Sequence, residues 1–101
     1  MQTIILQQGK FPYKFIALFP DGKKVTFGRQ GYSDYTIHHD KKRMMRYLIR
    51  HRKREDWKKS GKYTAGFWSR WVLWSKPNFK SAIKQTKKIL GNKYNIKIKK
   101  L

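Results

Sequence analysis

The sequence has 101 residues, of which 26 are lysine or arginine and five are acidic, so its formal net charge at pH 7 is +21. A chain of this length forms one domain, and its 39% apolar residues suffice for a modest core, which argues against wholesale disorder. The absence of cysteine excludes disulfides and thiolate metal sites. A compact chain with this charge repels itself and needs an acidic partner, such as nucleic acid, an anionic membrane or acidic proteins.

The positive charge is concentrated in the second part of the chain. Residues 1–40 carry five basic and three acidic residues, whereas residues 41–101 carry 21 basic and two acidic residues. We therefore expect the first part to form an ordinary sheet and the second part to carry the electrostatic function.

The first 28 residues predict short strands. Residues 3–6 form a short β-branched run typical of an edge strand. Residues 13–19 and 23–27 alternate in the manner of strands, and the turn signal Pro20-Asp21-Gly22 lies between them. This pattern predicts a β-hairpin over residues 13–28.

A basic helix is predicted over residues 41–58, which contain no proline or glycine and follow Asp40, a residue able to cap the first turn. One face of this helix is apolar and holds Met44, Tyr47, Leu48 and His51. The opposite side holds six basic residues and no acid, here called the basic stripe: Lys42, Arg43, Arg46, Arg50, Lys53 and Arg54. Because like charges four residues apart destabilise a helix, the stripe indicates an acidic partner.

Two more helices and a strand are predicted after a break at residues 59–62. Residues 66–75 carry three tryptophans at helical spacing and apolar residues nearly all round, which is typical of a buried helix. Asn78 can cap a last helix over residues 79–90, Gly91 ends it, and residues 94–98 alternate as a strand. The last helix carries a second basic patch, formed by Lys80, Lys84, Lys87 and Lys88.

Together these elements predict a single basic α+β domain over residues 1–101. We expect an N-terminal β-hairpin, joined by the C-terminal strand, to pack against two or three amphipathic helices. The predicted core consists of Met44, Tyr47, Leu48, Trp68, Trp71, Ile83 and Leu90.

The sequence shows no pattern typical of catalysis or metal binding. His38, His39 and His51 have no cysteine to help them, and adjacent histidines in an extended loop point apart, so we expect no metal and no cofactor. Glu55 and Asp56 are neighbours among lysines, which indicates charge relief rather than a pair of carboxylates for acid–base chemistry. We therefore expect no enzymatic activity and no small-molecule substrate.

Membrane insertion is not expected either, because the longest apolar run around the tryptophans, residues 71–74, is far too short to span a bilayer. Basic residues interleaved with aromatics are instead typical of nucleic-acid binding, in which cations neutralise phosphates. The gap between the basic and tryptophan helices, about seven residues, exceeds the usual helix-turn-helix turn of three or four. Contact with double-stranded DNA would therefore be non-specific.

Two segments of the sequence resemble a family of small basic proteins of large nucleocytoplasmic DNA viruses, the group that includes chloroviruses and mimivirus-like viruses. They are PDGKKVTFGRQGYSDYTIHHDKKRMMRYLIRHRKREDW and TAGFWSRWVLWSKPNFKSAIK, and the likeness covers roughly residues 13–90. It rests on FG at 27–28, GYSDYT at 31–36, HD at 39–40, RH at 50–51, TAGFWSRW at 64–71 and LWSKP at 73–77. The resemblance implies a viral origin and a place in the virion, and it assigns no activity and no site residues.

Two functions are compatible with these features. In the first, which we favour at this point, the protein is a minor capsid component of the virion that binds acidic surfaces of capsid proteins, and also packaged DNA, through its basic helix faces. In the second, it is a non-specific DNA-binding protein that condenses or packages the viral genome. Both place the protein in the virion, and in the host cytoplasm or nucleus during assembly, and both use the basic stripe and the second basic patch.

Overall fold

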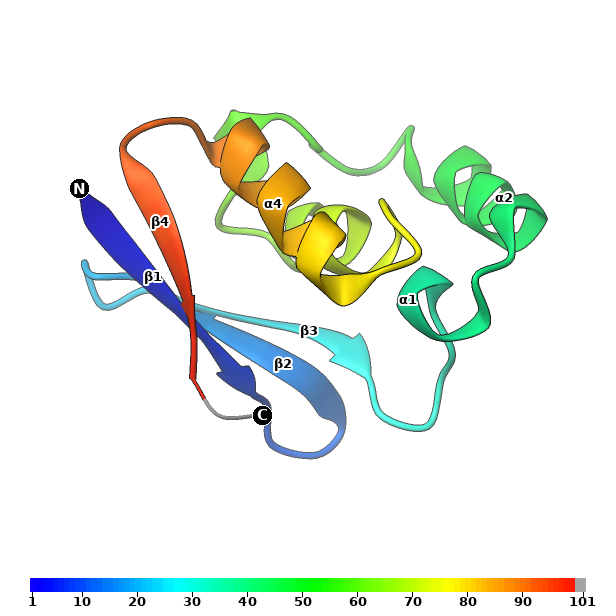
Figure 1. The fold of residues 1–101 in the computed structure, drawn as a ribbon, viewed down its shortest axis with the longest axis horizontal. Coiled ribbons are helices and arrows are strands. Elements are labelled where there is room, and N and C mark those ends of the chain that lie inside the picture. Colours follow the sequence, from blue (N-terminus) through cyan, green and yellow to red (C-terminus); the bar gives the residue numbers. More distant parts are fainter. Residues whose placement is uncertain (100–101) are drawn as a thin grey trace.

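The computed structural model describes residues 1–99 and has an α+β fold, with helices covering one face of a sheet (Figure 1). The strands are β1 (Gln2–Gln8), β2 (Tyr13–Leu18), β3 (Lys24–Arg29) and β4 (Tyr94–Ile98). The α-helices are α1 (Tyr35–His38), α2 (Lys41–His51), α3 (Ala65–Trp68) and α4 (Phe79–Leu90). A 3₁₀ turn, η1 (Lys59–Gly61), precedes α3, and a π-helical turn, η2 (Ser69–Leu73), continues it.

The sheet has the strand order β3-β2-β1-β4. The predicted hairpin is confirmed, because β2 and β3 pair antiparallel, with Phe15 opposite Phe27. The C-terminal strand joins the sheet as predicted, but it pairs parallel with β1 and not with either strand of the hairpin.

The prediction of an edge strand over residues 3–6 was wrong. β1 is a seven-residue inner strand that pairs with β2 on one side and β4 on the other. Its side chains Ile4 and Leu6 are fully buried, which is typical of a strand inside the sheet rather than at its edge. A short apolar run does not by itself show how many neighbouring strands it has.

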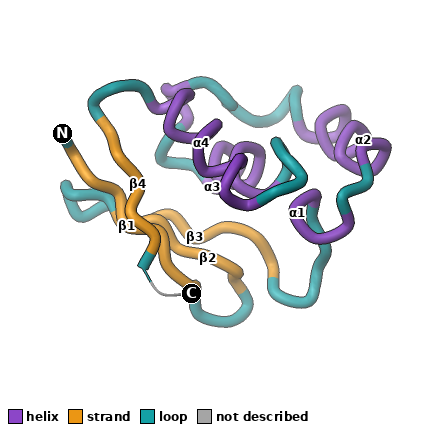
Figure 2. The backbone as a smooth tube through the Cα atoms, viewed as in Figure 1, coloured by secondary structure: helices purple, strands orange, loops and turns teal. Residues whose placement is uncertain are grey.

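The core lies between the sheet and the layer formed by α3, η2 and α4 (Figure 2). Of the predicted core residues, Trp68, Ile83 and Leu90 belong to it, and Trp71 packs against it while partly buried. Tyr47 is buried outside this cluster. Met44 and Leu48 are only partly buried, so their prediction was wrong. The reason is the position of α2, which lies beyond the end of the sheet and not over it (Figure 1).

The tryptophan segment is not the uniform helix predicted over residues 66–75. Its first turn, α3, is α-helical, and the next turn, η2, is π-helical. The wider turn changes which side chains face inward, and both Val72 and Leu73 are buried. The indole N–H of Trp68 donates to the Lys62 carbonyl at 2.8 Å, which holds this segment against the chain before it.

The basic helix is shorter than predicted, since α2 ends at His51 and not near residue 58. The two acidic residues that follow α2, Glu55 and Asp56, both accept hydrogen bonds within the next loop. Asp56 accepts hydrogen bonds from the Lys58 amide at 3.0 Å and the Ser60 hydroxyl at 2.6 Å. The interpretation of Glu55 and Asp56 as charge relief was therefore incomplete, because both carboxylates also accept hydrogen bonds within the loop after the helix.

The same loop leaves no room for a side chain at Gly61. A Cβ atom there would lie 1.9 Å from the carbonyl oxygen of Asp56. We expect Gly61→Ala to lower the free energy of unfolding by about 2 kcal/mol, because the backbone of the loop must move. Urea denaturation measures this, with Gly22→Ala as the control.

Gly22 has a φ of +92° but nothing within 4 Å of an added Cβ. Its replacement by alanine measures backbone strain alone, which costs about 1 kcal/mol. If Gly61→Ala is no more destabilising than Gly22→Ala, close packing does not explain the glycine at position 61.

Candidate nucleic-acid interface

α2 begins at Asp40, whose carboxylate accepts hydrogen bonds from the amides of Lys42 at 3.0 Å and Arg43 at 3.3 Å. The predicted N-cap is therefore confirmed. The hydrogen bonds from Arg43 and Lys42 lower the pKa of Asp40, so its carboxylate stays charged at the positive end of the helix. This cap fixes where the basic helix starts.

Four aromatic rings attach α2 to the rest of the protein, and we call them the aromatic column: His51, Tyr47, Trp74 and His38. The rings of Tyr47 and Trp74 are stacked, with centroids 4.4 Å apart and planes 3° apart. His51 stacks on Tyr47 at 4.2 Å, and His38 of α1 lies 5.4 Å from Trp74. Because offset aromatic pairs stabilise beyond their buried area, the column holds α2 in one position.

The loop after α2 strengthens this attachment. The Nδ1 of His51 lies 3.0 Å from one carboxylate oxygen of Glu55, and the Trp57 indole N–H donates to the other at 2.9 Å. An ionised carboxylate only accepts hydrogen bonds, so Nδ1 of His51 carries the proton. Both oxygens of Glu55 are thus occupied, and its negative charge is used inside the loop.

All six residues of the basic stripe are exposed. Four of them lie on α2, whereas Lys53 and Arg54 lie in the loop that follows, because the helix ends early. Within residues 1–99 none of the six forms an ion pair with an acid, since the acids that form ion pairs bind Lys14, Lys23 and His51. Their charge is therefore available to a partner.

Three residues of the basic stripe come together around one ring. Arg43, Arg46 and Arg50 line a concave surface of about 140 Å³ with Trp74, and we call these four residues the arginine groove. Arginine presents a planar fork of N–H donors that matches phosphate oxygens in pairs. The groove thus has the shape and charge to hold a phosphate group.

The second basic patch lies elsewhere on the molecule. Lys84, Lys87 and Lys88 line a shallow pocket of about 420 Å³ with Met1 and Tyr94, and Lys80 is not part of its lining. The end of α4 that carries Lys88 lies on the side away from α2 (Figure 1). The structure therefore does not bring the two predicted sets of basic residues together.

Trp74 and His38 are the two residues of the aromatic column that sequence analysis did not place near α2. Trp74 packs against the core, as its helical spacing predicts, but its ring also stacks on Tyr47 of α2, which the spacing does not indicate. His38 was interpreted as part of a loop, but its Nδ1 accepts a hydrogen bond from the Asp40 amide at 2.9 Å. No local pattern in the sequence indicates that these two rings meet.

His38 should make the attachment of α2 sensitive to pH. Its Nε2 is buried and has no hydrogen-bond partner within residues 1–99, and burial followed by the charge of Arg43 lowers its pKa below 6.5. The folded protein therefore binds this proton less readily than the unfolded chain, so the stabilisation is complete above pH 6.5 and decreases as the pH falls towards the lowered pKa.

We expect the free energy of unfolding to decrease between about pH 7.5 and about pH 5.5, as measured by urea denaturation at each pH. His38→Asn keeps an acceptor for the Asp40 amide but does not titrate, so its pH dependence should be weaker. An unchanged pH dependence in this variant would show that His38 is not the responsible group.

Within residues 1–99, no helix combines the length and the hydrophobicity needed to cross a membrane. In the same part of the chain, histidine, aspartate and glutamate side chains do not gather in groups of three or more that could hold a metal ion.

The similarity of this chain to known proteins is limited. Residues 9–51 match a family model described as a family of unknown function (DUF5754). This match includes the hairpin, α1 and the whole of α2, and its description assigns no role. No curated protein and no solved structure matches the chain. The resemblance to basic proteins of large DNA viruses therefore stays a prediction.

Proposed function

We propose that this protein is a non-enzymatic binding protein that holds the phosphate backbone of double-stranded DNA on α2 without reading its sequence. The observation that supports this most is the arginine groove, where three guanidinium groups line one concavity and none is paired with an acid within residues 1–99. Phosphate contacts of this kind position a protein on DNA but carry no sequence information.

Rigid attachment of α2 is the second support. A helix without tertiary contacts would lose conformational entropy on binding, which lowers the affinity. The aromatic column already holds α2, with Arg43, Arg46 and Arg50, against the rest of the protein. Each phosphate that is neutralised releases a condensed counterion, so the affinity should fall steeply with salt.

The test is the affinity for duplex DNA over a salt series, measured by fluorescence anisotropy. We expect the logarithm of the binding constant to fall linearly with the logarithm of the salt concentration and to be the same for unrelated sequences. The variant with Arg43→Gln, Arg46→Gln and Arg50→Gln should bind more weakly and lose roughly one unit of slope per arginine.

The matched control removes the same charge from exposed lysines outside the arginine groove: Lys10→Gln, Lys24→Gln and Lys76→Gln. We expect this variant to keep most of the affinity and slope. If both triple variants lose the same affinity, net charge alone drives binding and the groove is not a site.

A second candidate function is favoured by two exposed apolar side chains. Met45 and Ile49, one turn apart on α2, are 46% and 59% exposed beside the basic residues. Binding of the DNA backbone does not use exposed apolar side chains, whereas protein–protein interfaces commonly bury them. We therefore propose, as the alternative, a minor capsid component in the virion of a large DNA virus that binds acidic surfaces of capsid neighbours.

Cross-linking of purified virions followed by mass spectrometry tests this alternative. We expect cross-links from Lys41 or Lys42, which flank Met45, to acidic segments of a capsid protein. The absence of the protein from purified particles would rule the alternative out.

A further inference from the structure

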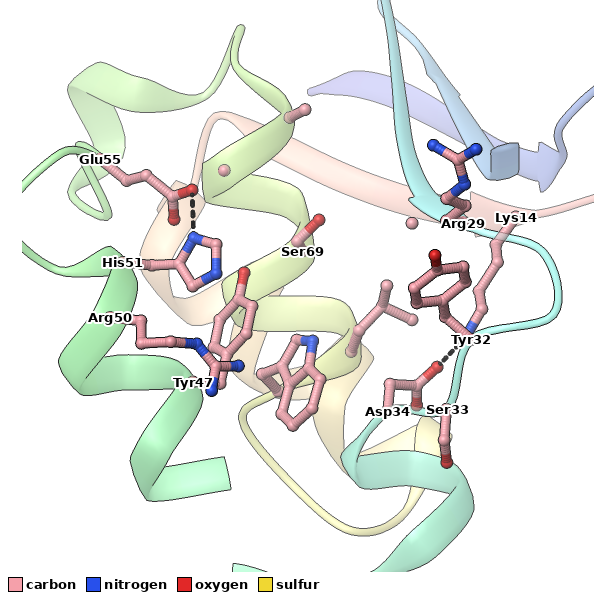
Figure 3. Close-up of a pocket in the computed structure, with 15 residues that line it drawn as sticks. Lys14, Arg29, Tyr32, Ser33, Asp34, Tyr47, Arg50, His51, Glu55 and Ser69 are labelled. Atoms are coloured by element: carbon pink, nitrogen blue, oxygen red, sulfur yellow. Dashed lines mark hydrogen bonds and ion pairs between the residues drawn. The ribbon is translucent and has the colours of Figure 1, made fainter. Parts of the chain in front are cut away.

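A larger pocket opens beside the arginine groove, between α2 and the loop that follows β3 (Figure 3). Its volume is about 420 Å³, within the ordinary range for ligand sites. Tyr47, Arg50 and His51 form the α2 wall, and Arg29 and Tyr32 belong to the opposite wall (Figure 3). Leu73 also lines the pocket. The pocket therefore depends on α2 being docked.

The charges that remain available in this pocket are positive. Asp34 is buried and bound to Lys14 at 2.5 Å, and Glu55 is occupied on both oxygens by His51 and Trp57. Arg29 and Arg50, which line opposite walls, form no ion pair with an acid within residues 1–99. An anionic group that enters the pocket would thus meet a cation on either side and no free carboxylate.

Tyr32 adds an aromatic surface to this cationic pocket. Tyr32 is 66% exposed, and the Arg29 guanidinium lies 5.7 Å from the centroid of its ring. Gly31, with a φ of +85°, makes the turn that presents this ring. An exposed ring next to cations is the arrangement on which nucleobases stack in proteins that bind single strands.

We propose that this pocket takes one nucleotide of an unpaired nucleic-acid strand, with its base stacked on Tyr32 and its phosphate bound by Arg50. This proposal rests on the proposed backbone binding, because Arg50 and Trp74 line both the arginine groove and the pocket. A strand held along the groove therefore passes the mouth of the pocket. A base inside a duplex is stacked on its neighbours and cannot enter, so unpaired strands and ends are the ligands.

The test compares a short thymidine oligonucleotide with an abasic deoxyribose-phosphate strand of the same length and charge, by fluorescence anisotropy at one salt concentration. Backbone binding alone predicts equal affinities, whereas a stacked base predicts about tenfold tighter binding of the thymidine strand. Equal affinities, with the salt dependence intact, would overturn the pocket proposal and leave the proposed function standing. A failure of both strands and of duplex DNA to bind would overturn both.

Two pairs of variants locate the effect. Tyr32→Leu should abolish the preference for the thymidine strand and Tyr32→Trp should keep it, and neither change disturbs the core because the ring is exposed. Arg50→Gln should weaken binding of both strands, because both carry the phosphate that Arg50 binds, whereas Lys24→Gln, an equal loss of charge outside the pocket, should weaken it less. A preference that survives Tyr32→Leu would show that the base does not stack on this ring.

Discussion

Trp68→Ala should lower the free energy of unfolding by about 3–5 kcal/mol, the usual cost of deleting a large buried aromatic side chain. Trp68 is fully buried and packs against the rings of Phe27 and Phe19, with centroids 5.8 and 6.0 Å away. Removal of the indole leaves a cavity and also leaves the Lys62 carbonyl without its donor. Since small domains have only about 5–15 kcal/mol of stability, the variant should be close to unfolding. Urea denaturation followed by circular dichroism measures the loss.

Trp68→Phe separates the two contributions. Phenylalanine keeps part of the aromatic packing with Phe27 but cannot donate to Lys62, so we expect an intermediate loss of stability. A loss below about 1 kcal/mol for Trp68→Ala would contradict the central place of this residue in the core.

Tyr47→Ala should release α2 while the sheet stays folded. Tyr47 is the middle of the aromatic column and contacts both Trp74 and His51. Its loss removes both stacking contacts and should make docking of α2 less favourable by about 3 kcal/mol. Hydrogen exchange measured by NMR should show amides 41–51 losing protection while those of β1 and β2 keep theirs.

Tyr47→Phe is the control for this prediction, because it keeps the ring and deletes only the hydroxyl group. Burial raises the pKa of Tyr47, so the native side chain is neutral at physiological pH and the control changes no charge. We expect it to keep α2 docked. In Tyr47→Ala, the affinity for duplex DNA should fall although every arginine is present. Equal hydrogen-exchange rates of amides 41–51 in Tyr47→Ala and Tyr47→Phe would show that the aromatic column does not hold α2.

Elements that depend on local signals could be predicted from the sequence. The hairpin follows from alternation around Pro20-Asp21-Gly22, and α4 follows from helical periodicity between Asn78 and Gly91. In the structure α4 has the predicted bounds, and the Asn78 side chain accepts from the Ser81 amide at 3.2 Å. A cap, a turn and a periodic segment involve residues that are near one another in the chain, so the sequence alone shows them.

Features that depend on distant residues could not be predicted. The place of β1 in the sheet requires pairing with β4, which lies near the other end of the described residues. The same limit applies to the candidate interface. A helical wheel shows that Arg43, Arg46 and Arg50 share a face, but only the fold brings Trp74 to it and places Tyr32 across the pocket from α2.

The parallel pairing of β1 with β4 has a consequence for how the protein folds during synthesis. Gln2 lies opposite Tyr94, and Leu6 lies opposite Ile98, so these partners are 92 positions apart. Contacts between such distant residues require closure of a long loop, which slows folding relative to proteins of local topology. Residues 94–98 must leave the ribosome before the sheet is complete, so β1 remains without one of its neighbours until then. We infer that completion of the sheet is a late event in the folding of this domain.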